Sequence, residues 1–152
     1  VFPNVMPLPD HSVDGIMTEH FLEHLTDDDA WLVIQDCHRL LKAGATLRVA
    51  VPDINHPLME DDRIRGADSS PYHLSIWSRN KLEGVMRQVG FEDVRPQSYW
   101  SFDGDLYDHH HRSDIDWSLG YIRRTVDHDE RNTPDKPFGK LWASSLIVDG
   151  VK

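Results

Sequence analysis

The stretch from Val13 to Val51, VDGIMTEHFLEHLTDDDAWLVIQDCHRLLKAGATLRVAV, decides the fold of this chain. Its two ends, Val13–Met17 and Thr46–Val51, are short apolar runs that predict buried strands. Between them, apolar residues recur at the three- and four-residue spacing of one helix face: Ala30, Val33, Ile34, Cys37, Leu40 and Leu41. A strand, a helix and a strand within about 40 residues predict a βαβ unit with parallel strands and a right-handed crossover.

The boundaries of the predicted helix follow from its flanking residues. Thr26 is a suitable N-cap, and the aspartates at 27–29 lie where the helix dipole favours negative charge. Lys42 and Gly44 are typical of a helix end, so we expect the helix to stop there.

After this unit, the pattern predicts a second helix between Ser78 and Gly90 and a third strand over Phe91–Trp100. Residues 53–77 lack a clear period and are expected to form a long connection. Residues 102–139 are polar and are expected to form an irregular insertion, although FDGD within them is a turn signal. We expect a last strand over Ala143–Val151 and a single domain over residues 1–152.

The composition limits the classes of partner. The net charge is −10, and no run rich in Lys or Arg offers a surface for phosphates, so nucleic acid and anionic membranes are not expected partners. Cys37 is the only cysteine, which excludes an intrachain disulfide and is typical of a reducing compartment. The sequence has no signal-peptide core and no apolar run near 18 residues, so we expect a cytoplasmic protein.

The segment TEHFLEHL contains H-x-x-E-H, formed by His20, Glu23 and His24, which is the zinc-binding pattern of inverted metallopeptidases. A peptidase of that kind carries both histidines on a long helix. Here a predicted strand precedes the pattern and a predicted N-cap, Thr26, follows it, so at most one helical turn fits between them. We therefore expect no metal site in this pattern.

A second histidine group, His109, His110 and His111, lies between Asp108 and Asp114. In a strand only alternate histidines share a face, so His109 and His111 could bind a metal with one of the aspartates, and a solvated polar loop is the other interpretation. The sequence contains no G-x-S-x-G, no G-x-G and no G-x-x-x-x-G-K-[ST]. A hydrolase elbow, a dinucleotide fingerprint and a P-loop are therefore absent from it.

The order of these segments resembles the second half of a class I S-adenosylmethionine-dependent methyltransferase. The resemblance lies in LPDHSVDGIMTEHFLEHLTDDDA (8–30), CHRLLKAGATLRVAVPD (37–53) and HLSIWSRNKLEGVMRQVGFEDV (73–94). The family's LLKPGG is replaced by LLKAGA, a departure at Ala43 and Ala45. The tail, GYIRRTVDHDERN with SSLIVDGVK, is similar to a subgroup of small predicted bacterial methyltransferases.

The resemblance implies a Rossmann-like half-sheet with the family's strand order 4-5-7-6 and strand 7 antiparallel. The family's Gly-rich loop and its first strands would lie before Val1. Strand 4 would then be a hydrophobic edge, which invites pairing. We therefore expect either a missing N-terminal segment or a homodimer formed through this edge.

The resemblance also implies a site for S-adenosylmethionine, provided that the missing N-terminal half is supplied. Thr18, Glu19 and His20 would border the methionine end of this cofactor, and Leu8 would lie near its adenine. Glu19 or His20 is a candidate catalytic base, and His73 is a third catalytic candidate on the side of the acceptor.

The resemblance implies methyl transfer to a small-molecule acceptor whose identity the sequence leaves open. Residues 53–77 and 102–139 are expected to shape the acceptor pocket. Trp77, Tyr99, Trp100, Tyr107 and Trp117 offer aromatic surface near it, and packing in the local core is the other interpretation for each of them. Two alternatives stay open: a non-catalytic remnant or interaction domain that kept the fold, and a His-rich metal-binding protein.

Overall fold

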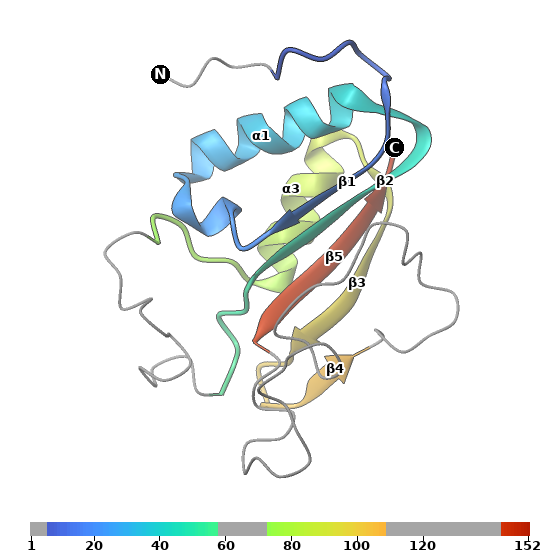
Figure 1. The fold of residues 1–152 in the computed structure, drawn as a ribbon. Helices are drawn as coiled ribbons and strands as arrows, with labels where there is room; N and C mark the ends of the chain where they lie inside the picture. The colour runs from blue at the N-terminus through green and yellow to red at the C-terminus, as the bar shows by residue number, and fades with distance from the viewer. Residues whose placement is uncertain (1–5, 58–72, 109–143) are drawn as a thin grey trace, which may run out of the picture.

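The computed structural model describes residues 6–57, 73–108 and 144–152. Its centre is a five-stranded sheet with the strand order β1-β2-β5-β3-β4. Two helices, α1 and α3, pack against each other and cover one face of the sheet (Figure 1). None of the helices in these described ranges is long and apolar enough to cross a membrane.

The predicted βαβ unit is confirmed. It consists of β1 (Val13–Glu19), a short 3-10 helix η1 (Leu22–His24), α1 (Asp27–Leu40) and β2 (Leu41–Pro52). The two strands are parallel. Thr26 caps α1 as predicted, since its side chain accepts a hydrogen bond from the backbone N–H of Asp29.

The predicted end of α1 was wrong: Lys42 and Gly44 lie in β2, which begins at Leu41 directly after the helix. Residues 41–45 are part of the strand rather than the helix because they pair with other strands. Leu41 pairs with Val13, and the N–H of Gly44 donates to the carbonyl of Lys152 at 2.7 Å. Gly44 has a φ of 78°, so this glycine allows an irregular, bulge-like conformation within the strand and does not cap the helix.

The second half of the chain forms α3 (Arg79–Val89), β3 (Glu92–Trp100), β4 (Leu106–Asp108) and β5 (Ser145–Val151). The predicted caps of α3 are confirmed, because Ser78 accepts the N–H of Lys81 and Gly90 is left-handed with a φ of 116°. Strand β5 lies between β2 and β3 and is antiparallel to both. The order β1-β2-β5-β3 is therefore the expected half-sheet 4-5-7-6 with an antiparallel strand 7.

The predicted turn signal FDGD connects β3 to β4, and Gly104 within it has a φ of 85°. Strand β4 thus occupies the first part of residues 102–139, for which we expected irregular structure. The remainder of that segment, with the histidines at 109–111, lies outside the described residues.

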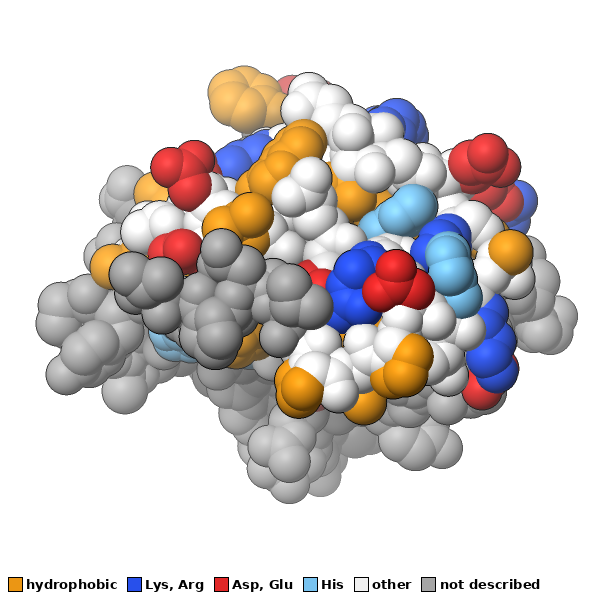
Figure 2. All heavy atoms as spheres, turned by 90° about the horizontal axis from the view of Figure 1, so that it is seen from above, with side chains coloured by type: hydrophobic (Ala, Val, Ile, Leu, Met, Phe, Trp, Pro, Cys, Tyr) orange, Lys and Arg blue, Asp and Glu red, His pale blue; other side chains and the backbone are white. Residues whose placement is uncertain are grey.

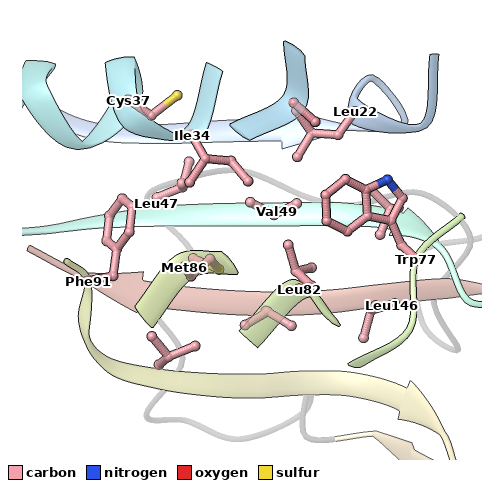
Figure 3. Close-up of a cluster of buried hydrophobic side chains, with 14 of the residues drawn as sticks. Leu22, Ile34, Cys37, Leu47, Val49, Trp77, Leu82, Met86, Phe91 and Leu146 are labelled. Atoms are coloured by element: carbon pink, nitrogen blue, oxygen red, sulfur yellow. The ribbon is translucent and has the colours of Figure 1, made fainter. Parts of the chain in front are cut away.

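The hydrophobic core lies between the sheet and the two helices. Alternate residues of β2, Leu47, Val49 and Val51, are fully buried against this side. Figure 3 shows Leu47 and Val49 facing side chains from α1 and α3, with Trp77 at one end of the cluster. This arrangement follows from the two periods of the sequence, two residues for a strand and 3.6 for a helix.

Candidate functional site

The carboxyl edge of the sheet brings together segments that are far apart in the sequence. Strands β1, β2 and β3 all end at this edge, while β5 and α3 begin there. In open α/β sheets, ligands bind beyond the carboxyl ends of the strands. The polar residues at this edge are therefore the candidates for function.

His20 follows directly after β1 and is held on both sides of its ring. Its φ is 49°, and its N–H donates to the carbonyl of Ala50 at 2.9 Å, so it stays attached to β2. Its Nε2 lies 2.9 Å from Oγ of Ser145, at the start of β5, and its Nδ1 lies 3.3 Å from Oε1 of Glu23. A carboxylate only accepts hydrogen bonds, so Nδ1 carries the proton in this arrangement and Nε2 accepts from the hydroxyl.

The arrangement of carboxylate, imidazole and hydroxyl resembles a hydrolytic triad, but its burial argues for a different role. Ser145 is fully buried, so its hydroxyl does not face a substrate. A nucleophile has to reach the reacting carbon, whereas an anchoring hydroxyl does not. We conclude that Ser145 and Glu23 orient His20.

Glu23 is 2% exposed and is the centre of a second group of contacts. Nε2 of His24 lies 3.9 Å from Oε1 of Glu23, and the rings of His24 and His73 are in edge contact with centroids 4.8 Å apart. The backbone N–H groups of Leu74 and Ser75 donate to the carbonyl of Glu23 at 2.8 and 3.1 Å. His73 is thus brought to the η1 segment by backbone hydrogen bonds of the residues that follow it.

Thr18 and Glu19 form the last positions of β1. Within the described ranges, β1 pairs with β2 on one side and with no strand on the other. Oγ1 of Thr18 is buried and has no hydrogen-bond partner among the residues that the structure describes. An unpaired buried hydroxyl is unfavourable, which makes this position a candidate contact for a polar ligand.

Leu8 does not lie with these residues. It precedes β1, so it is near the amino end of the strand, while Thr18, Glu19 and His20 are at the carboxyl end. The guanidinium of Arg39 fixes it there by donating to the carbonyl of Leu8 at 3.0 Å and to Oδ1 of Asp36 at 2.7 Å. The surface over this region, shown in Figure 2, has basic and acidic side chains next to each other and histidines beside them.

A pocket of about 380 Å³ opens on the other side of the carboxyl edge, between the start of α3 and the β3–β4 hairpin. Its walls are polar and aromatic: Asn55, Ser78, Arg79, Asn80, Tyr99, Trp100, Ser101, Phe102 and Tyr107. Tyr99 and Tyr107 stack with centroids 5.0 Å apart, and the guanidinium of Arg79 lies 4.6 Å from the Tyr99 ring. Because the Arg79 guanidinium also pairs with the Glu83 carboxylate at 2.9 Å, the flat aromatic surface suits a planar organic molecule rather than an anion.

This pocket agrees only in part with the expected aromatic surface. Tyr99 and Tyr107 line it, and Trp100 also borders it although it is only 1% exposed. Trp77 is 1% exposed as well and lies in the core, with its indole N–H donating to Ser75 Oγ at 2.9 Å. For Trp77 the core interpretation therefore holds: Leu74 and Ile76 are exposed, and the side chain of Trp77 points to the opposite side, into the core. Trp117 lies outside the described residues.

Asp53 connects the ends of β2 and β3 beneath the pocket. Its Oδ2 accepts the N–H of Trp100 at 2.7 Å, and its Oδ1 accepts the N–H of Asn55 at 3.0 Å. Burial raises the pKa of this carboxyl above its ordinary value of 3.8, and these two backbone donors oppose the rise. Asp53 therefore positions the pocket wall.

Sequence reasoning missed Ser145, Asp53 and Arg79 as parts of this edge. A signal existed for Asp53, since a polar residue directly after a predicted parallel strand falls at the carboxyl edge. Ser145 and Arg79 gave no such signal, because their positions depend on the pairing of β5 and on the start of α3.

Cys37 has the structural role that the helical pattern predicted. It is 2% exposed in the core, and burial raises the pKa of its thiol to about 12. A thiol with that pKa is almost never deprotonated at neutral pH and is a poor nucleophile.

Comparison with known proteins agrees with the resemblance. A family model described as "Methyltransferase domain" matches residues 3–49. Two curated relatives, probable S-adenosylmethionine-dependent methyltransferases from two strains of Mycobacterium tuberculosis, are 30% identical over 90 residues, which is 59% of this chain. The chain spans only 30% of the length of each of these relatives.

Solved structures support the same fold. A Thermotoga maritima S-adenosylmethionine-dependent methyltransferase, described as a possible histamine N-methyltransferase, has a TM-score of 0.60 at 18% identity. The match covers 98% of this chain and 60% of that one. An Archaeoglobus fulgidus methyltransferase has a TM-score of 0.58 at 15% identity, covering 95% of this chain and 62% of that one. At such identities these similarities show the fold alone.

Proposed function

We propose that this chain is part of a class I S-adenosylmethionine-dependent methyltransferase and that its protein transfers a methyl group to a small-molecule acceptor. The observation that carries the proposal is the polar group at the carboxyl end of β1: a buried Thr18 hydroxyl without a partner in the described residues, followed by Glu19 and the oriented ring of His20. These residues stand where an open α/β sheet binds its ligand.

The residues present fit the cofactor chemically. The Thr18 hydroxyl can donate to or accept from the polar groups of the cofactor, and the Glu19 carboxylate suits its positive charge. When bound, S-adenosylmethionine supplies an electrophilic methyl group. Thr18, Glu19 and His20 form the proposed contacts of this chain with it. Leu8, at the other end of β1, stays a sequence prediction.

Glu19 is the proposed general base, and His20 is a second candidate. An O- or N-acceptor loses a proton on methylation, and a carboxylate or imidazole within hydrogen-bond reach can take it. Both ring nitrogens of His20 already contact protein groups, so His20 acts directly only if Ser145 gives up its hydrogen bond. His73 is linked to His20 through His24 and Glu23, and it keeps a candidate role on the acceptor side.

The acceptor is proposed to enter from the pocket between α3 and the β3–β4 hairpin. Strand β3 is three strand positions from β1 in the sheet, or roughly 14 Å. An acceptor that rests on Tyr99 and Arg79 therefore has to extend along the edge to reach Glu19. This geometry favours an elongated molecule with an aromatic end.

The free edge of β1 is proposed to pair with a further strand, either from the same polypeptide or from a second copy of it. An unpaired strand edge is a template for pairing. Light scattering together with amide hydrogen exchange separates the cases. Protected outer amides of β1 in a monomer indicate a strand of the same polypeptide, protection that appears only in a dimer indicates a second copy, and fast exchange of these amides in a monomer contradicts both. A cytoplasmic location remains a prediction from the sequence.

The test uses the full-length protein that contains this chain. S-adenosylhomocysteine is titrated by calorimetry, and transfer of a labelled methyl group is measured over a panel of amines, phenols and carboxylic acids. We expect S-adenosylhomocysteine to bind. We expect Glu19→Gln to lower turnover by about 100-fold or more, which is the usual effect of removing a general base. The matched control is Asp14→Asn, on the same strand at its amino end, whose side chain is 85% exposed.

The alternative, a non-catalytic domain that kept the fold, predicts a different result. Absence of any heat with S-adenosylhomocysteine supports that alternative and contradicts the proposal. Binding with normal turnover in both Glu19→Gln and His20→Ala removes these two residues from the catalytic role and leaves the cofactor site in place.

A further inference from the structure

Three potential metal ligands meet beside the proposed methyl-transfer site. One carboxylate oxygen of Glu23 and one ring nitrogen each of His24 and His73 lie within 4.8 Å of one another. The residues come from two segments: Glu23 and His24 are in η1, while His73 lies in the segment that leads into α3. Two imidazoles and one carboxylate are the ligand set of many zinc sites.

The two segments are held together by hydrogen bonds that do not involve the ligands. The N–H groups of Leu74 and Ser75 both donate to the carbonyl of Glu23, and the hydroxyl of Ser75 donates to the carbonyl of Leu22 at 3.1 Å. The edge contact of the His24 and His73 rings, at an interplanar angle of 70°, places the two imidazoles side by side. Backbone hydrogen bonds at the carboxyl edge therefore hold Glu23, His24 and His73 close together.

Glu23 supplies an independent observation. The residue is 2% exposed, and its Oε2 is buried without a hydrogen-bond partner in the part of the chain that the structure describes. A buried carboxylate oxygen without a donor is unfavourable, and a cation next to it removes that cost. His24, by contrast, has a side chain that is 43% exposed, so the group is open to solvent on one side.

We propose that Glu23, His24 and His73 bind a divalent transition metal of the zinc type, with the fourth position open to water. Ligand atoms in a tetrahedral zinc site lie roughly 3.4 Å apart, from metal–ligand distances of about 2.1 Å. Nε2 of His24 and Oε1 of Glu23 are already 3.9 Å apart. Small side-chain rotations therefore suffice to close the site.

This ligand set differs from the one that H-x-x-E-H suggested. His20, the first histidine of the pattern, has its Nε2 against Ser145 and its Nδ1 against Glu23. It is therefore a hydrogen-bond partner of the proposed ligand Glu23, an outer position that commonly orients a ligating carboxylate. His73, which is 49 positions after His24 in the sequence, takes the place of the ligand that the pattern lacks.

The proposed metal connects η1 to the segment entering α3, so it fixes the wall of the carboxyl edge. It also bears on His20, because Glu23 contacts both the metal position and that ring. This inference depends on the metal ligands alone and does not rest on methyl transfer.

The test measures metal binding with Zn²⁺ and Co²⁺ on the purified full-length protein, after removal of metal by a chelator. All variants are made in a background with His109, His110 and His111 changed to Gln, which removes the competing histidine tract of the sequence. Affinity is measured by competition with a chromophoric chelator, and the visible spectrum of bound Co²⁺ reports its coordination. Folding of every variant is checked by circular dichroism.

We expect one equivalent of Zn²⁺ in this background, a tetrahedral Co²⁺ spectrum, and a melting temperature that Zn²⁺ raises. His24→Ala and His73→Ala should each weaken Zn²⁺ binding by about 100-fold or more. Loss of a residue that only hydrogen-bonds a metal ligand already costs about 10- to 100-fold, and loss of a ligand should cost at least as much. The control His11→Ala, at the amino end of the sheet, should bind as the background does.

The proposal is overturned if the background protein binds less than one equivalent, or if His24→Ala and His73→Ala bind as tightly as it does. Binding that disappears when the tract at 109–111 is changed also overturns it. Glu23→Gln adds a further test, and if that variant fails to fold, the two histidine variants decide the outcome.

Discussion

The two faces of the sheet are built from alternate residues of the same strands, yet they are held together differently. On the helix-covered face, Leu47, Val49 and Val51 join a large apolar cluster. On the opposite face, Ala50 and Ile147 form a small cluster next to Arg48, whose guanidinium makes two hydrogen bonds to Asp149, at 2.8 and 2.7 Å. Among the described residues, the first face is stabilised by many apolar contacts, whereas the second centres on the ion pair of Arg48 with Asp149.

The largest expected effect comes from breaking that ion pair. Asp149→Ala leaves the buried charge of Arg48 without its partner, which is expected to cost about 3–5 kcal/mol of unfolding free energy. The double variant Arg48→Met with Asp149→Leu should recover most of this loss, because both charges are removed. Urea denaturation of the three proteins measures it. A cost below about 1 kcal/mol for Asp149→Ala would show that water, rather than Asp149, satisfies Arg48.

On the helix-covered face, Leu82→Ala removes a fully buried side chain of α3. The expected cost is about 2–5 kcal/mol, and its size depends on how far the surrounding cluster closes the cavity. Chemical denaturation gives the value, with Leu32→Ala as the control, since Leu32 is on α1 but is 40% exposed. Equal losses in the two variants would contradict the placement of the core.

At the carboxyl edge of the sheet, Asp53→Asn should lower the free energy of unfolding by about 1–3 kcal/mol at neutral pH. The reason is that one of the two backbone N–H groups bound to this side chain loses its acceptor. The pKa of the Asp53 carboxyl is higher in the folded state than its ordinary value of 3.8. The protonated carboxyl therefore adds to the free energy of unfolding. This contribution is complete below pH 3.8 and is lost as the pH rises through the folded-state pKa. The advantage of the wild type over Asp53→Asn should therefore grow as the pH falls. Denaturation at several pH values tests this, and a constant difference would contradict the raised pKa.

The smallest effect is expected at the start of α1. Thr26→Ala removes the side-chain acceptor for the N–H of Asp29, and the expected loss is about 1 kcal/mol. Thr26→Ser keeps the hydroxyl and should retain most of the stability. Thermal melts of the two variants give the comparison, and identical melting temperatures would mean that the cap is replaced by water.

The helix-covered face could be predicted from the sequence, because its signals are local. The apolar period over Ala30–Leu41 and the caps Thr26, Ser78 and Gly90 each depend on a few neighbouring residues. The end of α1 was misjudged since the partners of residues 41–45 include Lys152, which is distant in the sequence.

The carboxyl edge was harder to predict for the same physical reason. The ring of His20 is fixed by Ser145, 125 positions away, and His73 is brought to His24 by hydrogen bonds to the carbonyl of Glu23. Such contacts leave no period in the sequence. The placement of Thr18, Glu19 and His20 at the end of a strand was predictable, but the grouping of Glu23, His24 and His73 required the structure.

The carboxyl end of β1 is proposed to border the cofactor. The most direct test is to follow backbone amide shifts by NMR while S-adenosylhomocysteine is added to the full-length protein. We predict large shifts at Thr18, Glu19 and His20 and small ones at Leu8 and Asp14, which lie at the other end of the strand. Binding that leaves Thr18, Glu19 and His20 unshifted would contradict the claim.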